Sequence, residues 1–565
     1  MMKGQPIRFS SCRGVAFEIK PHDDPFAIPK PTIHQQANDD GPIPPDGRRF
    51  SVSSWIHQGT GGRSSKVGPG DIIQRSLSVA SSSHFCDLDV DDDPNDYIEA
   101  DEVVVDVTLS NMEQGKTDDD DLPRALTLSK TKKQTSSRLS VILLDQGLFT
   151  VYKRLFLACF TLNAVGLVLA ATGRFPYGRD KAALFSIANI FALTICRSEA
   201  FLRAVFWAVV KLLGRSWVPI WIKTAATSLL QSLGGIHSGC GLSSVAWLIY
   251  SLVLTLKDRA NTSSVIVVVA SSILSLISLS CLAAFPLVRH LHHNLFERIH
   301  RFAGWAALGL LWAFVVLTTS YDSETATYSN GVAIKLAKSV EFWFTFAITV
   351  LIIIPWLTVR RVAVTTSSPS GHASIVRFAG GVIPGILGRI SPSPLSEWHA
   401  FGIISDGKSE HMMLCGAVGD FTKSLVSNPP SHLWVRGVHF AGLPYLVNLY
   451  DRVLLVATGS GICVFLSFLL QPCRADVCVV WVAKGIEQNF GQEIKEMMSR
   501  HPKDKVIVHD TALMGRPNVS QMSVEMAKKW RAEVVIVTSN PEGSRDVVDA
   551  CKGAGIPAFG PIWDS

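Results

Sequence analysis

Six runs of apolar residues, each about as long as a membrane-crossing helix, occupy the middle of the chain. They cover residues 155–172, 182–200, 236–256, 264–286, 302–320 and 340–358. At a rise of about 1.5 Å per residue, a helix needs roughly 20 predominantly apolar residues to cross the hydrocarbon core of a bilayer. The pattern predicts an α-helical membrane bundle of about six helices within residues 149–361, in contact with the lipid bilayer.

A polar segment precedes the bundle. Residues 1–85 are rich in Ser, Gly, Pro and Asp and lack sustained apolar periodicity, so they bury too little apolar surface to offset the entropy of ordering. Acidic blocks follow at residues 87–106 and 118–121 and complete the segment 1–148. We expect a disordered, Ser-rich and acidic cytosolic tail. Basic residues precede serines at 48–51 and 75–78, which makes kinases hypothetical partners; chance occurrence of such short motifs is the alternative.

After Arg361 the apolar runs shorten to strand length. Within residues 362–448, short segments such as 400–405 and 411–418 are broken by Gly, Pro and Asp, which predicts a small antiparallel β-barrel. Within residues 449–565, apolar strands alternate with helices at 486–500 and 519–530, which is typical of a doubly wound α/β domain. Gly459 and Gly461 follow the first of these strands, where glycine lets the backbone approach a pyrophosphate; a tight structural turn is the alternative.

Composition supports a membrane protein and limits its other roles. Only 18% of residues are charged, the mean hydropathy is +0.26, and a net charge of +6 is too small and too dispersed to indicate nucleic-acid binding. The eleven cysteines show neither zinc spacing nor a disulfide framework, so we expect buried structural thiols. Basic residues in the linkers 201–235 and 287–301 place both termini in the cytosol by the positive-inside rule, at the plasma membrane or an endomembrane.

Two histidines lie at the same end of the predicted bundle. His237 begins the third apolar run, and His300 precedes the fifth. Ionisable groups at the membrane are functional candidates by default, and histidine is a common metal ligand. The neighbouring His290, His292 and His293 are more simply interpreted as contacts with lipid headgroups.

Four short motifs follow one another in the C-terminal part of the chain. Residues 398–405 read Trp-His-Ala-Phe-Gly-Ile-Ile-Ser, residues 419–422 Gly-Asp-Phe-Thr, residues 457–462 Ala-Thr-Gly-Ser-Gly-Ile and residues 515–517 Gly-Arg-Pro. In this order they resemble the flavin-binding His-Pro-Phe-Thr strand, the Gly-Asp-Trp-Thr element, the NADPH-binding turn and the Gly-Arg-Pro motif of the ferric reductase and NADPH oxidase superfamily, and most closely its TmpA-like integral membrane branch. The resemblance covers residues 150–565 and implies a ferredoxin-reductase-like module that binds FAD and NAD(P)H.

The resemblance assigns cofactor-binding roles but no catalytic residue. The residues are His399, Phe401, Ser405 and Thr422 for the flavin, and Gly459, Gly461 and Arg516 for the dinucleotide. Arg516 is included because a guanidinium clamps phosphate. The chain departs from the family where a Cys-Gly-Pro element is replaced by residues 538–543 and where Ala400 replaces a proline. These departures bear on hydride transfer more than on the fold.

The resemblance also implies haem. Family members stack two haems between histidine pairs roughly 13 or 14 residues apart on two helices. At those distances from His237 and His300, this chain has Tyr250, Ser251, Ala313 and Phe314. Ligands for an outer haem are therefore missing, and we expect at most one haem b, with His237 and His300 as its metal ligands. Structural hydrogen bonds are the alternative role for both histidines.

These observations predict a membrane-anchored, flavin-dependent oxidoreductase that moves electrons from NAD(P)H to FAD at the cytosolic face. The alternative is a non-catalytic or attenuated membrane sensor or signalling protein that keeps the reductase fold. The altered Cys-Gly-Pro element favours the sensor, whereas the glycine turn and the Gly-Arg-Pro motif favour the enzyme. A transporter has little support, because the chain shows neither repeats nor broken helices in matching halves.

Overall fold

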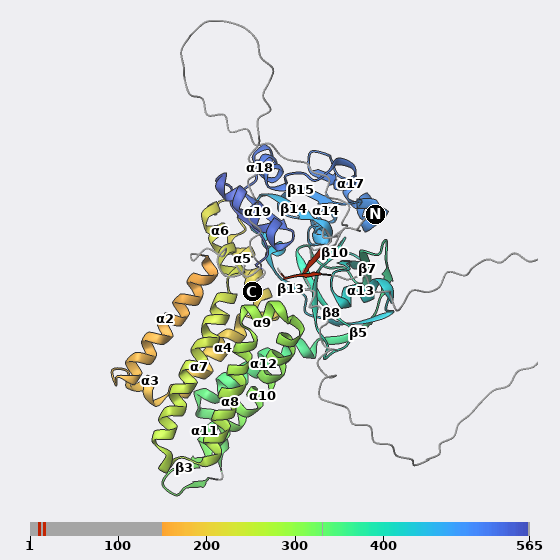
Figure 1. Ribbon diagram of the computed structural model, residues 1–565. Coiled ribbons are helices and arrows are strands. Elements are labelled where there is room, and N and C mark those ends of the chain that lie inside the picture. The colour runs from red at the N-terminus through yellow and green to blue at the C-terminus, as the bar shows by residue number, and fades with distance from the viewer. Residues whose placement is uncertain (1–8, 13–14, 19–149, 330, 563–565) are drawn as a thin grey trace, which may run out of the picture. The chain divides into compact units, whose positions relative to one another are not determined.

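The computed structural model describes residues 9–12, 15–18, 150–329 and 331–562 (Figure 1). The chain divides into two compact units, Met1–Leu77 and Ser78–Ser565. In the first unit, the described residues form an antiparallel hairpin of β1 (Phe9–Cys12) and β2 (Val15–Glu18). The rest of the predicted disordered tail, with its hypothetical kinase sites, lies outside the described residues.

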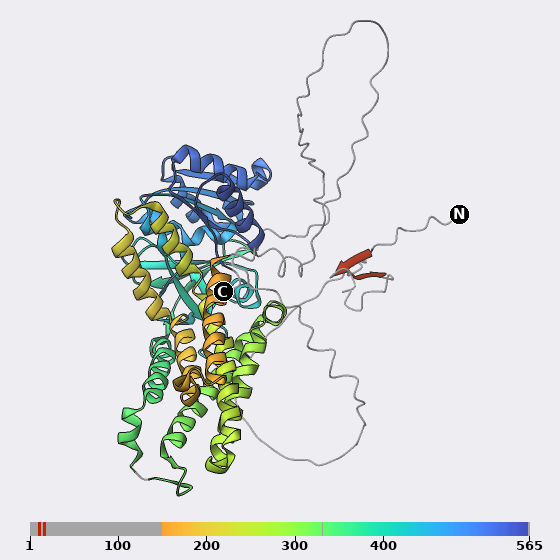
Figure 2. The same cartoon turned by 90° about the vertical axis from the view of Figure 1, so that its left-hand side faces the viewer.

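The second unit begins with a bundle of long helices that lie side by side (Figures 1 and 2). Its helices are α2 (Val151–Ala171), α3 (Pro176–Asp180), α4 (Ala182–Ile195), α5 (Glu199–Leu213), α6 (Ile220–Gln231), α7 (Gly234–Lys257), α8 (Ser264–Ala283), α9 (Pro286–Leu291), α10 (His293–Ser320), α11 (Val332–Lys338) and α12 (Val340–Leu357). A short 3-10 turn η1 (Arg259–Asn261) and the strand pair β3 (Tyr321–Asp322) and β4 (Thr327–Tyr328) connect them at one end. Helix α7 packs against α2, α4 and α8, and α10 packs against α8.

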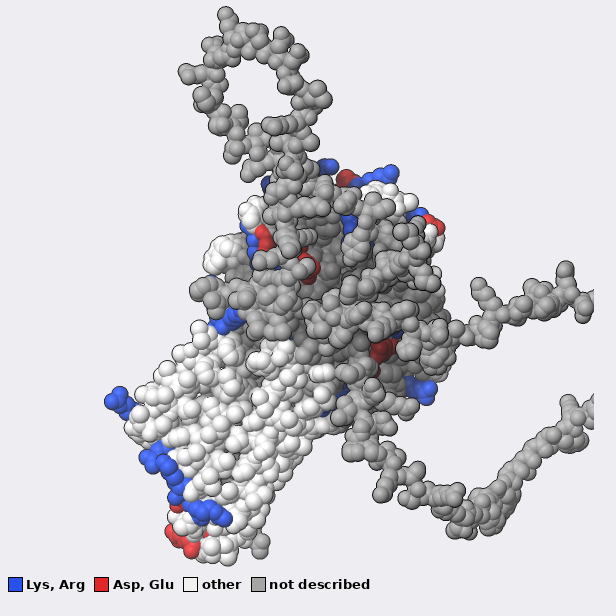
Figure 3. All heavy atoms as spheres, viewed as in Figure 1, with Lys and Arg blue, Asp and Glu red and all other residues white. Residues whose placement is uncertain are grey.

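Five described helices are long and apolar enough to cross a membrane, namely α2, α7, α8, α10 and α12. The second predicted span is different, because it consists of α4 and α5, which meet at an angle of 65°. The helix stops at the polar stretch around Arg197, and the Ser198 hydroxyl caps a new helix by accepting a hydrogen bond from the backbone of Phe201. Figure 3 shows one face of the bundle nearly free of charged side chains between its two ends.

Two antiparallel sheets follow the bundle. Their strands are β5 (Val359–Ala363), β6 (Thr365–Ser367), β7 (Ala373–Ala379), β8 (Ile386–Ser391), β9 (His399–Gly402), β10 (Ile404–Ser405), β11 (Glu410–Gly416), β12 (His432–Arg436) and β13 (Phe440–Ala441). One sheet has the order β10-β11-β7-β6, and the other has the order β13-β8-β12-β5 with β9 paired to β8. Helix α13 (Asp420–Ser427) connects β11 to β12.

The two antiparallel sheets are joined at two corners. Strand β5 continues through Val364 into β6, and β9 continues through Ile403 into β10, so each of these segments belongs to both sheets. Strand β8 pairs with β12, β12 pairs with β5, and β5 continues along the chain into β6. Strand β6 pairs with β7, β7 with β11 and β11 with β10. Strand β10 follows β9 in the chain, and β9 pairs with β8, so the circuit of strands closes. The sequence predicted a single barrel here, and the structure has two sheets connected in this closed order.

The predicted parallel sheet is confirmed at the C-terminal end. Its elements are η2 (Leu443–Leu449), β14 (Arg452–Thr458), η3 (Gly459–Val464), α14 (Leu466–Leu470), β15 (Asp476–Ala483), α15 (Ile486–Phe490), α16 (Gln492–Ser499), β16 (Val506–Asp510), α17 (Thr511–Met514), α18 (Val519–Trp530), β17 (Val534–Thr538), α19 (Pro541–Gly553) and β18 (Ala558–Phe559). The strand order is β16-β15-β14-β17-β18 with every pairing parallel. The helix predicted at 486–500 is interrupted at Gly491, whose φ of +87° favours glycine.

Helices cover both faces of the parallel sheet, because successive side chains along each strand point to opposite faces and both sets are apolar. Leu455 and Ala457 of β14 pack with α14, α15 and α16, whereas Leu454 and Val456 pack with α18 and α19. We refer to residues 359–562, which contain the three sheets, as the head. The first of these two cores extends into the antiparallel sheets, so those sheets and one face of the parallel sheet share a continuous apolar core.

The hairpin of α5 and α6 joins the bundle to the head, and Figure 2 shows it extending alongside the head. Phe206 and Leu230 of this hairpin are buried in the core of the head. The Thr227 and Tyr450 hydroxyls lie 2.8 Å apart, and the Gln231 amide donates to the carbonyl oxygen of Gly560 at 3.0 Å. The predicted linker 201–235 is therefore packed against the head as the hairpin of α5 and α6.

Candidate functional site

The predicted flavin-binding residues His399 and Thr422 come from β9 and α13, which the fold brings together. The His399 ring stacks on Phe421 with ring centroids 4.6 Å apart. Burial lowers the pKa of His399, so its imidazole is neutral at pH 7. Its Nε2 atom is buried without a hydrogen-bond partner among the described residues, which marks it as a group available to a ligand.

The hydroxyls of Ser405 and Thr422 have a structural role that the sequence did not indicate. A hydroxyl donates one hydrogen bond and accepts two. The Ser405 hydroxyl donates to the Glu410 carbonyl and accepts from the backbone of Val382 and Gly407. The Thr422 hydroxyl donates to the Gly419 carbonyl at 3.0 Å and accepts from the backbone N–H groups of residues 418 and 419. Both hydroxyls thus make all their hydrogen bonds within the protein, and Phe401 is a core residue only 4% exposed. A flavin-binding role for these three residues stays a prediction.

Gly459 and Gly461 form the turn at the carboxyl end of β14. Gly459 has a φ of +52°, and its carbonyl accepts a hydrogen bond from the indole of Trp481 at 2.9 Å. The Thr458 hydroxyl lies 2.7 Å from that of Ser539, which follows β17. Chain connections leave β14 and β17 in opposite directions along the sheet, and open α/β sheets bind ligands at such switch points.

Arg516 lies at the same carboxyl edge but two strands away from the glycine turn. It follows β16 and is exposed. The preceding Gly515 has a φ of +72°, and its carbonyl lies 2.9 Å from Nε2 of His509, which holds this loop. Within the described part of the chain, no hydrogen bond or ion pair joins Arg516 to Gly459 or Gly461, although all three residues lie at one edge of the sheet.

The predicted metal ligands His237 and His300 come together from α7 and α10, with ring centroids 6.3 Å apart. Nδ1 of His237 lies 3.0 Å from the carbonyl oxygen of Leu193, and Nδ1 of His300 lies 3.4 Å from that of Ser280. A neutral imidazole that donates from Nδ1 keeps a lone pair on Nε2. These contacts favour the tautomer in which each Nδ1–H donates to the backbone carbonyl and each Nε2 keeps its lone pair.

Both histidines line a cavity of about 950 Å³ in the bundle. Gly241 and Gly304 also line it, each four residues after a histidine, and a Cβ at either position would meet nothing within 4 Å. The helices are therefore open to the cavity beside each ring. The repeated His-x-x-x-Gly spacing was present in the sequence but gained a meaning only from the fold.

The cavity wall is mostly apolar, and its polar side chains include the Glu199 carboxylate and five cations. The cations that line it are Lys153, Arg197, Arg289, Arg301 and Arg436. Within the described residues, no group of three or more His, Cys, Asp or Glu side chains has metal-binding geometry. A metal in this cavity would therefore have His237 and His300 as its protein ligands and would need further ligands from a prosthetic group.

The far half of the bundle is filled with packed side chains where an outer haem would need space. Trp247 is 1% exposed, stacks on Phe185 at 4.6 Å and meets Tyr250 at 6.2 Å. The Asn163 amide oxygen accepts hydrogen bonds from Trp247 at 2.9 Å and from Asn189 at 2.8 Å. These hydrogen bonds and ring contacts join α2, α4 and α7. They include Tyr250, which occupies one of the positions where a histidine ligand of an outer haem was expected and is absent from the sequence.

Arg436 lies between the cavity and the start of β9, a position that no sequence motif indicated. Its guanidinium carbon lies 4.8 Å from the ring centre of Trp398, which directly precedes His399, and 5.8 Å from that of Trp356. Trp356 meets Trp305 at 5.1 Å, and both line the cavity. Glu199, at the start of α5, binds Arg436 at 3.1 Å and also Arg389.

Comparisons with known proteins point to reductases. A family model described as "Adenylate-forming reductase 03009, C-terminal domain" matches residues 443–565. Adenylate-forming reductase 03009 of Coprinopsis cinerea is 32% identical over 444 residues, which are 77% of this chain and 42% of the relative. Adenylate-forming reductase 06235 of the same fungus is 33% identical over 429 residues, 75% of this chain and 41% of the relative. The chain thus spans less than half the length of these curated relatives.

Structural comparison finds ferredoxin reductases at low overall similarity. Ferredoxin-NADP+ reductase from Plasmodium falciparum with 2'P-AMP covers 36% of this chain and 94% of its own, with a TM-score of 0.27 and 10% identity. The ferredoxin reductase in carbazole 1,9a-dioxygenase covers 36% and 67%, with a TM-score of 0.28 and 13% identity. TM-scores this low carry no argument about function. The comparisons give no evidence for the ferric reductase or TmpA-like resemblance; they show similarity to adenylate-forming reductases instead.

Proposed function

We propose that this chain is a membrane-anchored oxidoreductase in which the head takes electrons from NAD(P)H onto FAD and the bundle holds a single haem b. The observation that carries the proposal is the pair His237 and His300, whose rings face one cavity from two helices. The similarity to adenylate-forming reductases supports a reductase activity in general. The comparisons do not support haem, so the haem rests on this geometry.

The cavity fits a haem in three respects: the separation of the two histidine rings, the room beside them, and the positive charge of the lining. With metal–nitrogen bonds of about 2 Å and roughly 1.1 Å from each nitrogen to its ring centre, two imidazoles on one iron have centroids roughly 6 Å apart. The observed separation is 6.3 Å. Gly241 and Gly304 leave room beside the two rings, and cations such as Arg197 at the rim suit propionate groups. His237 and His300 would hold the iron.

The head offers groups suited to a flavin and a dinucleotide. His399 has a buried Nε2 atom without a partner beside α13, where it is placed to donate to a phosphate oxygen. We interpret the closed order of antiparallel strands as the flavin-binding barrel, and the turn at Gly459 and Gly461 as the approach to the dinucleotide pyrophosphate. When bound, flavin supplies hydride acceptance and stepwise electron release.

The bundle is proposed to anchor the head to a bilayer. The five apolar helices and the bent pair α4–α5 have the required length and composition. We place the head and both termini in the cytosol at the plasma membrane or an endomembrane, following the positive-inside rule. Because packed side chains around Trp247 fill the far half of the bundle, electrons reaching the cavity would leave on the side on which they entered.

A second function, a sensor without turnover, is favoured by the residues after β17. Residues 538–543, which include Ser539, stand where the family that the sequence resembles has a Cys-Gly-Pro element. The hydroxyl of Ser539 contacts Thr458, the backbone N–H of this serine donates to the Ser544 hydroxyl at 3.2 Å, and its side chain is 3% exposed. A buried serine whose hydroxyl is already hydrogen-bonded is suited to a protein that binds NAD(P)H without transferring its hydride.

One preparation tests both proposals. The full chain is purified in detergent, its absorbance spectrum is recorded, and NADPH is added without oxygen. A Soret band that disappears in His237→Ala and in His300→Ala, but persists in the exposed control His432→Ala, supports the haem. Flavin that bleaches with NADPH supports the enzyme, and flavin that stays oxidised supports the sensor. A preparation with neither flavin nor Soret band refutes both.

A further inference from the structure

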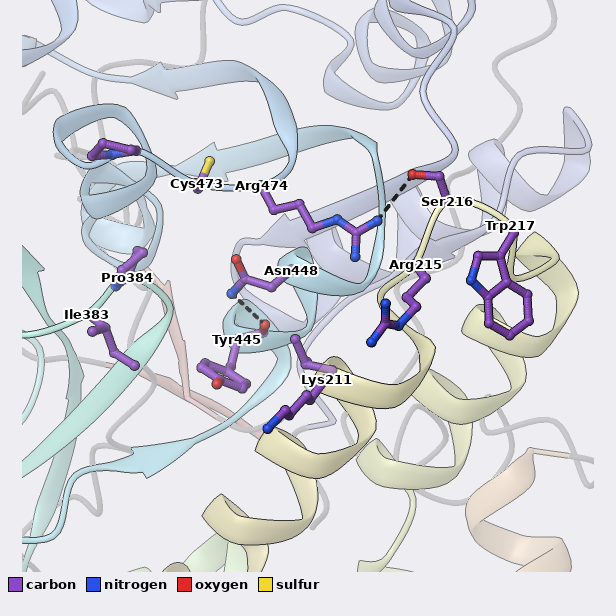
Figure 4. A pocket seen from close by; sticks show the side chains of 12 residues that line it. Lys211, Arg215, Ser216, Trp217, Ile383, Pro384, Tyr445, Asn448, Cys473 and Arg474 are labelled. Carbon is purple, nitrogen blue, oxygen red and sulfur yellow. Dashed lines mark hydrogen bonds between the residues drawn. The ribbon is translucent and has the colours of Figure 1, made fainter.

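A second cavity lies where the bundle hairpin, the antiparallel sheets and the parallel sheet meet. Its volume is about 730 Å³, within the usual range for small-molecule sites. Its walls come from the end of α5 and the following turn, the loop before β8, η2, and the loop between α14 and β15 (Figure 4). The cavity is separate from the haem cavity, and no residue lines both.

Three cations from different segments line this second cavity. Lys211 comes from the last turn of α5, Arg215 from the turn that follows, and Arg474 from the loop before β15. Figure 4 shows their side chains around one space. No carboxylate is among the described residues that line the cavity, and Asp451, which does not line it, binds Arg474 at 3.0 Å. The cavity is therefore suited to an anion.

Neutral groups complete the wall. Tyr445 and Asn448 are in η2, and burial raises the pKa of Tyr445, so its hydroxyl stays protonated and can donate. Asn448 donates its side-chain N–H to the Tyr445 carbonyl at 3.0 Å, which holds the amide beside the cavity. Trp217 is 78% exposed at the rim, where an indole can stack on a planar ring.

The location distinguishes this cavity from the proposed dinucleotide site. Arg474 precedes β15 and Asn448 precedes β14, so the cavity lies at the amino ends of the parallel strands, whereas Gly459 lies at their carboxyl ends. Helix α5 leaves the bundle at Glu199, at an angle of 65° to α4, and packs against the head through Phe206, so Arg215 lies just beyond the end of α5 and beside the head. The vesicle measurement in the test distinguishes a soluble nucleotide from a lipid headgroup.

We propose that this cavity binds a soluble nucleoside monophosphate, with the phosphate among Lys211, Arg215 and Arg474 and the base against Trp217. Arginine binds phosphate through paired N–H donors, and stacking on an indole tolerates any base. Because the cavity is built from the hairpin and both parts of the head, a bound ligand stabilises their contact. The site does not depend on the redox proposal.

The test uses the full chain in detergent and UMP, which is not a fragment of FAD or NAD(P)H and so does not report the dinucleotide site. Calorimetric titration should show saturable UMP binding. Lys211→Ala/Arg215→Ala should weaken that binding by roughly tenfold or more, because two charge-assisted contacts are lost. Arg500→Ala is the matched control, since it removes an exposed cation that does not line the cavity.

Two further measurements separate base from phosphate and nucleotide from lipid. Trp217→Ala should weaken UMP but leave inorganic phosphate unchanged. Vesicles containing phosphatidate should not displace UMP. The proposal is overturned by absence of UMP binding at millimolar concentration, by equal affinity in wild type and Lys211→Ala/Arg215→Ala, or by displacement of UMP by the vesicles.

Discussion

Replacing Glu199 with glutamine should loosen the head from the bundle, because this carboxylate pairs with two guanidinium groups in a largely buried place. Its side chain is 11% exposed, that of Arg436 15% and that of Arg389 31%. Removing one partner of a buried ion pair costs about 3–5 kcal/mol, since the remaining charge stays desolvated. Because Arg389 is partly solvated, we expect a loss of about 2–4 kcal/mol, or roughly 30- to 700-fold in the local opening equilibrium.

The assay is amide hydrogen exchange of β8 and β12, the strands that carry Arg389 and Arg436, on the full chain in detergent. Exchange under native conditions reports local opening without requiring a two-state transition for the whole protein. Glu487→Gln is the matched control, because it breaks an exposed pair with Lys495 and should cost below about 1 kcal/mol. If Glu199→Gln changes protection no more than this control, the pair does not hold the head in place.

Three other substitutions test separate parts of the structure. Gly235→Ala should destabilise the bundle, because the new Cβ would lie 2.2 Å from the Tyr152 carbonyl oxygen on α2. Gly241→Ala is the control, since a Cβ there meets nothing within 4 Å. Thermal aggregation in detergent compares the two variants, and equal aggregation temperatures would contradict this packing. Gly402→Ala should cost about 1–3 kcal/mol, since its Cβ would lie 2.9 Å from the backbone of η3; faster proteolysis between the antiparallel and parallel sheets is the expected readout, and unchanged proteolysis would be evidence against it. Burial lowers the pKa of His439 to about 4, so the folded state binds a proton less readily than the unfolded state, and stability should fall by up to about 3 kcal/mol as the pH drops from about 6.5 to about 4. His439→Gln should flatten that loss of hydrogen-exchange protection in β13, and an unchanged pH profile would rule out this histidine as its cause.

Local patterns in the sequence predicted most elements. Apolar runs of membrane length located the long helices, and short apolar runs with glycine turns located the parallel sheet, because both signals depend on neighbours a few residues apart. The bend between α4 and α5 was missed, although the polar residues around Arg197 and the cap at Ser198 were visible. Length alone favoured one continuous span over two helices that meet at an angle.

The candidate sites depended on contacts between distant segments. The sequence named His237, His300 and His399, but the 6.3 Å separation of the first two and the unpartnered Nε2 of the third follow from how helices and strands pack. The hydrogen bonds of the Ser405 hydroxyl to backbone groups could not be predicted, because only the folded loop brings those groups near it.

By itself, the sequence determined which segments are apolar, where chain turns occur and which residue types are available for chemistry. Only the tertiary structure decided which of those residues share a cavity, which hydroxyls are already bonded, and that Arg436 links the bundle to the head. The physical reason is one of range. Secondary structure follows from side-chain periodicity over a few residues, whereas a site forms from side chains that long-range packing places within a few ångströms of each other.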